Sequence, residues 1–124
     1  MDAQELIRRY ATGERDFQQA YLHNQQLFRI NLSETNLSKV RFEGTDMMQA
    51  NLSQTDLSHA NLSNCNLNEA LLREANLTQA NLYCSNLNET DFQGANLTQA
   101  TLLGADLYKA NLSGANLSRA NLQG

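Results

Sequence analysis

The dominant feature of the sequence is a large apolar side chain at every fifth position. From Arg15 to Gly124 the 110 residues divide into 22 pentads without an insertion, and the central residue is Leu in 18 pentads, Phe in three and Met in one. The residue two places before the centre is Ala in 12 pentads and Ser, Thr or Cys in six others. The remaining three positions are mostly polar, with Asn or Asp before the centre in 17 pentads, so we expect them to face solvent.

A five-residue spacing of apolar side chains fits neither an α-helix nor a flat strand. In a helix five residues turn through about 140°, and in a strand an odd step alternates between the two faces, so neither element buries all the leucines together. If each pentad is one short straight side followed by a turn, every central side chain points toward a common axis. Glycines suit such turns, and Gly44, Gly94, Gly104 and Gly114 stand at pentad ends where another pentad follows. The pattern therefore predicts a coil with a narrow apolar lumen.

Runs such as Ala50-Asn51-Leu52, Ala60-Asn61-Leu62 and Ala110-Asn111-Leu112 resemble the A-(D/N)-L-x-x signature of the pentapeptide repeat family. The resemblance extends over about nine-tenths of the chain. It implies an all-β solenoid, a right-handed quadrilateral β-helix with four pentads per coil and small residues at the inner corners. Such proteins are frequent in cyanobacteria, so the resemblance is compatible with a cyanobacterial source. The 22 pentads then make about five and a half coils, roughly 26 Å long at about 4.8 Å per coil, and residues 20 apart stack on one face.

The pentad centres are the side chains that we expect to fill the lumen. They include Phe17, Leu32, Leu37, Phe42, Met47, Leu52, Leu57, Leu62, Leu67, Leu77, Leu87, Phe92, Leu97 and Leu107. The absence of Pro agrees with this arrangement, because each coil offers its backbone N–H groups to a neighbour. We also expect side-chain hydrogen bonds along the stacked pairs Asn61/Asn81 and Asn66/Asn86.

Residues 1–14 are expected to form an N-terminal capping helix, followed by the β-helix over 15–124. Asp2 and Glu5 resemble a capping box in which Glu5 reaches back to the start of the helix, and Gly13 is placed to end it. One helical face carries the apolar residues Ala3, Leu6, Ile7 and Tyr10. We expect this helix to cover the lumen and the unpaired edge of the first coil, with partner binding by the helix as the alternative.

The repeat continues unchanged to Gly124, with no second cap. An open coil end presents unpaired backbone groups and an apolar lumen, which proteins normally cover. We therefore expect either a homodimer formed through this end or a native chain that continues past Gly124.

Charge and chain length exclude several classes of protein. The net charge of −4 is mild and scattered, which does not indicate direct nucleic-acid binding. No apolar stretch has the length of a signal peptide core or a membrane span, so we expect a cytoplasmic protein that does not bind membranes. The two cysteines are expected to be free thiols, because Cys65 occupies the small inward position whereas Cys84 ends its pentad and points outward.

No group of residues indicates catalysis, a cofactor or a metal. His23 and His59 lie at outward positions without a ligand partner at a recognised spacing. Glu69 and Glu89 stand one coil apart on one face, where they resemble a catalytic carboxylate pair, but a flat face offers no pocket to desolvate them. We therefore expect that the protein is not an enzyme.

Outward apolar residues are the exception in this pattern and are our candidates for partner binding. Phe28 with Met48 and Tyr83 with Leu103 are spaced to stack in pairs, and we place Tyr108 near the corner that the two faces share.

Two functions follow from these observations. The first is a non-catalytic structural or protein-interaction module that presents flat polar faces to an unknown protein partner. The second is implied by the resemblance: some pentapeptide repeat proteins mimic duplex DNA and bind type II topoisomerases such as DNA gyrase. Duplex DNA carries about 15 negative charges over roughly 26 Å, whereas residues 15–124 hold ten acidic and seven basic side chains, a net of −3. Charge favours the first function, and a supercoiling assay distinguishes the two.

Overall fold

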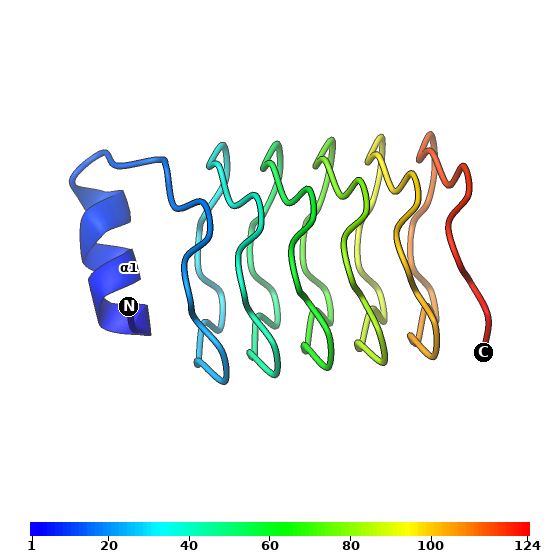
Figure 1. Ribbon diagram of the computed structural model, residues 1–124, viewed down its shortest axis with the longest axis horizontal. Helices are drawn as coiled ribbons and strands as arrows, with labels where there is room; N and C mark the ends of the chain where they lie inside the picture. Colours follow the sequence, from blue (N-terminus) through cyan, green and yellow to red (C-terminus); the bar gives the residue numbers. More distant parts are fainter.

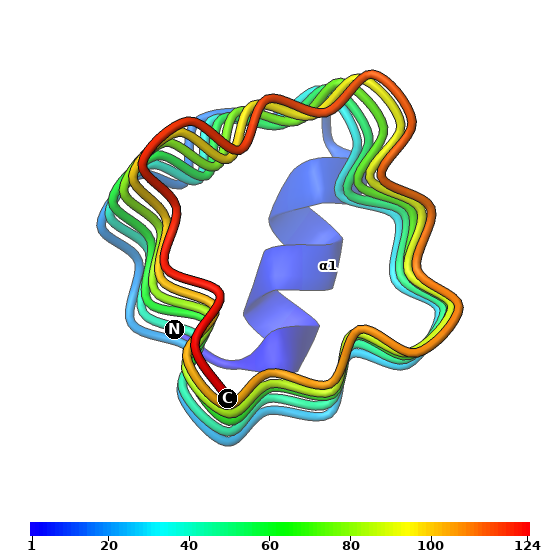
Figure 2. The same ribbon diagram turned by 90° about the vertical axis from the view of Figure 1, so that its right-hand side faces the viewer.

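The computed structural model describes residues 1–124 and shows a right-handed quadrilateral β-helix with one helix at its N-terminal end (Figure 1). The helix α1 spans Ala3–Ala11. No side of the coil forms an extended strand, because each pentad contributes a single bridge residue, the one before its centre. Every bridge is parallel and joins residues 20 apart, from Asp16↔Asn36 to Thr101↔Asn121. Viewed along the axis, the coils superimpose and α1 lies across the open end of the lumen (Figure 2).

Backbone hydrogen bonds join each coil to both of its neighbours. The amide of Leu62 donates to Asn81 O at 2.7 Å, and the amide of Asn81 donates to Ala60 O at 2.9 Å. The same pattern recurs around the coils. Most backbone N–H groups at the bridge and centre positions therefore have an acceptor, although each side of a coil contains only one bridge residue.

The corners are tight turns that place one residue of each pentad in the left-handed region. Ala60 N donates to Leu57 O at 3.0 Å, and His59, the third residue of that turn, has a φ of 58°. A β-turn with positive φ at its third residue alone is type II. Every pentad ends in such a residue, and only five of these 22 positions are Gly. Since a non-Gly residue costs about 1 kcal/mol there, the inter-coil hydrogen bonds and the packed lumen must offset that strain. The predicted corner after each pentad is confirmed.

The Asn and Asp residues before the pentad centres stabilise the turns. Each of the 17 accepts a hydrogen bond through Oδ1 from the backbone amide two residues later, as Asn51 does from Ser53 N at 3.0 Å. The predicted Asn61/Asn81 and Asn66/Asn86 ladders are therefore wrong, because these Oδ1 atoms accept from the backbone of their own turns. Through the middle coils these residues are half-buried rather than fully solvated. Local turn capping, not stacking, explains the preference for Asn and Asp.

Inter-coil side-chain bonds are found instead at the last position of the pentad. Gln49 Nε2 donates to Glu69 Oε2 at 2.9 Å, and Gln79 Nε2 donates to Gln99 Oε1 at 3.0 Å. Both pairs are exposed, so they contribute little to stability.

The pentad centres and the small residues before them form one continuous core. From Phe17 to Leu102 every centre is at most 2% exposed. The expected lumen residues lie in this core, except that Leu107 is only partly buried near the C-terminal end. Polar residues at the small position bond to backbone: Thr45 Oγ1 donates to Leu22 O at 2.8 Å and accepts from Gln25 N at 3.2 Å. The core therefore has the small diameter that its Leu and Ala content requires.

Helix α1 begins and ends as the sequence indicates, but its apolar face is narrower. Asp2 Oδ1 accepts from Glu5 N at 2.9 Å, and the helix ends at Ala11, followed by Gly13 with a φ of 99°. The predicted return bond from Glu5 is absent, since that side chain lies 3.9 Å from Arg8 instead. Ile7, expected on the buried face, is 51% exposed.

Contacts with the first coils hold α1 in place. Leu6 is completely buried over the lumen, Ala3 N donates to Gln25 Oε1 at 2.9 Å, and Tyr10 Oη donates to Ser33 O at 3.1 Å. Of the two neighbouring residues, Leu6 faces the lumen of the solenoid, and this explains why Ile7 is exposed.

The turn-capping role of Asn can be tested at Asn51, whose stacked neighbours Asn31 and Leu71 are uncharged. Asn51→Ala should lower the free energy of unfolding by about 1 kcal/mol, because the Ser53 amide loses its acceptor. Asn51→Asp keeps an oxygen in place and should cost less than half as much. Chemical denaturation followed by circular dichroism measures both. Equal losses for the two variants would contradict the capping role.

Candidate interaction surface

The five apolar residues proposed from the sequence for partner binding lie at two corners of the solenoid. Tyr83 is 45% exposed, and Leu103 lies partly exposed in the same stack on the next coil. Phe28 is 52% exposed at another corner, with the partly exposed Met48 beside it in its stack. Tyr108, at 64%, is the most exposed of the aromatic residues.

Tyr108 does not lie where the sequence placed it. It follows Phe28 by 80 residues and therefore belongs to the stack of Phe28 and Met48, separated from them by Asn68 and Asn88. Leu103 occupies the preceding corner of the same coil. The five candidates therefore form two separate pairs and one isolated tyrosine, not one continuous patch.

The residues Tyr83, Cys84 and Leu103 make up what we call the Tyr83–Leu103 patch. Tyr83 N donates to Asn81 Oδ1 at 2.9 Å, which fixes the turn that carries both Tyr83 and Cys84. On the next coil, a Cβ at Gly104 would lie 3.0 Å from Cys84 Sγ, so Gly104 leaves room for the thiol. Hydrogen bonding with the Cys84 thiol raises the pKa of Tyr83, so the tyrosine is neutral at physiological pH.

The two cysteines are free and differ in environment, as expected. Cys65 is 2% exposed, its Sγ donates to Phe42 O at 3.1 Å, and burial raises its pKa from 9.0 to about 12. Cys84 is exposed. Because the thiolate is the reactive form, Cys84 is the accessible nucleophile of the pair.

His23, His59, Glu69 and Glu89 all lie on the surface, and neither histidine belongs to the stack of the two carboxylates. His23 contacts Tyr21 edge-to-face with ring centroids 4.4 Å apart, and His59 is exposed at a turn. Glu69 accepts the bond from Gln49, and neither it nor Glu89 lines a groove. No group of three His, Cys, Asp or Glu residues is arranged to hold a metal ion.

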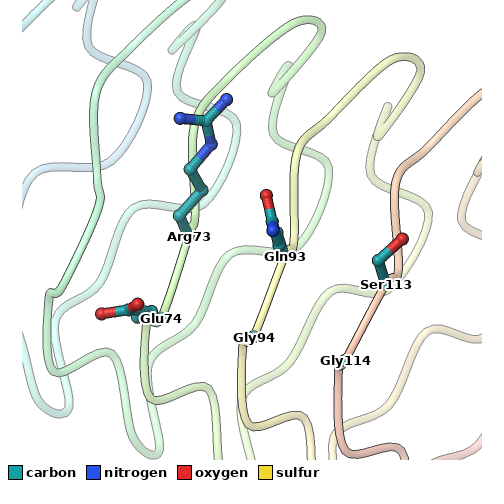
Figure 3. A pocket seen from close by; sticks show the side chains of 6 residues that line it. All are labelled: Arg73, Glu74, Gln93, Gly94, Ser113 and Gly114. Atoms are coloured by element: carbon teal, nitrogen blue, oxygen red, sulfur yellow. The ribbon is translucent and has the colours of Figure 1, made fainter.

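A shallow polar groove of about 410 Å³ was not anticipated from the sequence (Figure 3). It is lined by Gly94 and Gly114, which have no side chain, and by Arg73, Glu74, Gln93 and Ser113, all on three successive coils. Burial opposes ionisation of Asp91, but the bond from Arg73 Nε, at 2.5 Å, contributes to a net lowering of its pKa. The side chains of the groove can form hydrogen bonds with a polar group. In the sequence, the groove is indicated by two pentad-end glycines, Gly94 and Gly114, that lie one coil apart.

No helix of the structure has the length and apolar character needed to span a membrane.

Comparison with known proteins supports the architecture. The family described as pentapeptide repeats matches residues 16–54, 55–94 and 85–124, with 8 copies of its motif. No protein with a curated description matches the sequence.

Solved structures share the fold along most of the chain. Rfr23, a pentapeptide repeat protein from the cyanobacterium Cyanothece 51142, is 25% identical with a TM-score of 0.85 and covers 95% of this chain and 97% of its own. A pentapeptide repeat protein of the Arabidopsis thaliana thylakoid lumen is 28% identical with a TM-score of 0.64, covering 80% and 72%. QnrB1, a plasmid-mediated fluoroquinolone resistance protein, is 22% identical with a TM-score of 0.62, covering 86% and 68%, and shows the fold alone.

The different environments of the thiols predict selective labelling. Iodoacetamide near neutral pH should modify Cys84 and spare Cys65 until the chain is unfolded in urea, as read by mass spectrometry of peptides. Because folding raises the pKa of Cys65 from 9.0, its thiol contributes full stability below pH 9, and this contribution declines as the pH rises toward 12. Cys65→Ala should remove that part of the pH dependence. Modification of Cys65 in the folded protein at the rate of Cys84 would contradict the assignment.

Proposed function

Because the chain belongs to the pentapeptide repeat family, we propose that it is a non-catalytic protein-interaction module, a rigid solenoid whose flat polar sides carry a small apolar contact surface. The observation that carries the proposal is the Tyr83–Leu103 patch, in which two apolar side chains stack on neighbouring coils of a mostly polar exterior. Tyrosine is enriched among the residues that dominate binding energy at protein interfaces. The proposed partner is a protein whose apolar side chains pack on Tyr83 and Leu103.

The rigidity of the solenoid supports this function. Tyr83 and Leu103 project from turns whose backbones are bonded to each other, since Cys84 N donates to Leu103 O at 3.0 Å. A contact surface that is already ordered loses little conformational entropy when a partner binds. A small patch on this scaffold can therefore contribute more affinity than the same residues on a mobile loop.

Mimicry of duplex DNA has weaker support. The net charge of −3 over residues 15–124 is far below the roughly 15 negative charges of a duplex of the same length. Two of the ten acidic side chains are moreover neutralised locally, since Glu43 pairs with Arg41 at 3.2 Å and Asp91 pairs with Arg73. The sequence identity to QnrB1, 22%, is too low to imply that the two proteins share a target.

We further propose a homodimer in which the C-terminal coils of two chains meet. Leu122 is 50% exposed, and the amides of Leu107, Leu112 and Leu117 donate no hydrogen bond. A second copy would cover both the apolar lumen and these donors. Sedimentation of residues 1–124 should show a dimer, and Leu122→Lys should shift it to a monomer with an unchanged circular dichroism spectrum. A monomer at all concentrations tested would exclude the dimer.

The Tyr83–Leu103 patch can be tested by capture of a partner. The double variant Tyr83→Ser with Leu103→Ser should fold normally, because both side chains are exposed or partly exposed, but should lose any partner retained by the immobilised native protein. Tyr108→Ser is the control, since it removes a more exposed aromatic residue from another corner. Undiminished capture by the double variant, quantified by mass spectrometry, would refute the patch.

A further inference from the structure

We propose that the seam between α1 and the first coil binds a short peptide segment in which an apolar side chain is followed by a carboxylate. The seam contains a groove of about 400 Å³, separate from the Tyr83–Leu103 patch. Ile7, Tyr10 and Ala11 of α1 line one wall, and Phe28, Arg29 and Ile30 line the other. The proposal assumes the interaction function above but does not depend on the patch.

The walls of the groove expose apolar surface that the repeat pattern does not require. Ile7 is 51% and Phe28 is 52% exposed, although polar residues predominate at outward positions of the solenoid. Their exposure has a structural origin, because Leu6 covers the lumen and leaves Ile7 at the side of the helix, above the corner that carries Phe28. The result is a cleft wide enough for one or two apolar side chains.

Arg29 is the only charged residue that lines the groove. Its Nε donates to Gln49 Oε1 at 2.7 Å, and its guanidinium carbon lies 5.0 Å from the centroid of the Phe28 ring. No carboxylate lies within 4.0 Å of it, in contrast to Arg9, Arg41 and Arg73, each of which has an acidic partner. The bond to Gln49 and the stacking on Phe28 hold the guanidinium in place, while its two terminal nitrogens have no hydrogen-bond partner.

These features together select the chemistry of the ligand. A guanidinium with two free parallel N–H groups recognises a carboxylate in bidentate geometry, and a ring already stacked on the cation fixes its orientation. The apolar walls require an aliphatic or aromatic side chain next to that carboxylate. We favour a peptide over a free fatty acid, because half-exposed walls cannot enclose a long alkyl chain, whereas a peptide continues across the surface on either side.

Three synthetic peptides of equal length test the proposal by fluorescence anisotropy. The first has a leucine–phenylalanine pair followed by aspartate and glutamate, the second replaces the acids by asparagine and glutamine, and the third replaces the apolar pair by serines. The acidic peptide should bind saturably and at least about tenfold more tightly than either of the others. Equal binding of the acidic and amide peptides, or no saturation by any peptide up to about 1 mM, would overturn the proposal.

Variants of the full chain separate the roles of charge and shape. Arg29→Gln should abolish the preference for the acidic peptide over the amide peptide, and Ala11→Trp should weaken binding by filling the groove from an exposed position. Unchanged circular dichroism spectra show that each variant folds. The Tyr83→Ser, Leu103→Ser double variant should bind the acidic peptide like the native chain, so loss of the patch and loss of the groove are observed independently. A preference retained in Arg29→Gln would exclude Arg29 as the carboxylate site.

Discussion

The structure depends on backbone hydrogen bonds between residues one coil apart. Leu62 and Asn64 donate to the following coil, and Asn61 donates to the preceding one, at distances of 2.7 to 2.9 Å. These bonds keep the pentads in register, so that stacked centres fill the lumen at the same height on every side. They also hold 17 non-glycine residues at positive φ, a conformation that would not persist in the isolated turns. The lumen, the corners and the flat sides are all consequences of this single ladder.

The architecture could be predicted from the sequence because the lumen imposes one rule on every pentad. Leu52, Leu57 and Leu62 are spaced so that only a chain that turns after each of them can bury all three, and all three are fully buried. The role of Asn was missed for a physical reason. Polarity alone predicts that a residue next to a turn is solvent-exposed, whereas the side-chain oxygen of these residues satisfies a backbone amide two residues away. The position of Asn, two residues before a turn amide, is the sequence feature that indicates this hydrogen bond.

The surface was less predictable than the core. Stacking of Tyr83 on Leu103 follows from their 20-residue separation, and the same count should have assigned Tyr108 to the stack of Phe28. The position of Ile7 could not be derived, because the rotation of α1 about its axis is decided by how Leu6 docks on the lumen. The groove beside Ile7 depends on that docking as well. The five-residue periodicity determines the repeat, but the junction between α1 and the β-helix depends on tertiary contacts.

Stacking at intervals of 20 residues also determines how such a chain can change in length. Duplication of a whole coil would lengthen the shaft by about 4.8 Å and leave every downstream residue on its original side. Insertion of a single pentad would preserve the lumen equally well, yet it would rotate everything beyond it by a quarter turn. Placed between Tyr83 and Leu103, such an insertion would move the two side chains to different corners without any loss of core packing. The fold and the surface are thus under separate constraints. Packing of the lumen requires the sequence pattern to repeat every five residues, whereas the alignment of surface residues requires a repeat of 20.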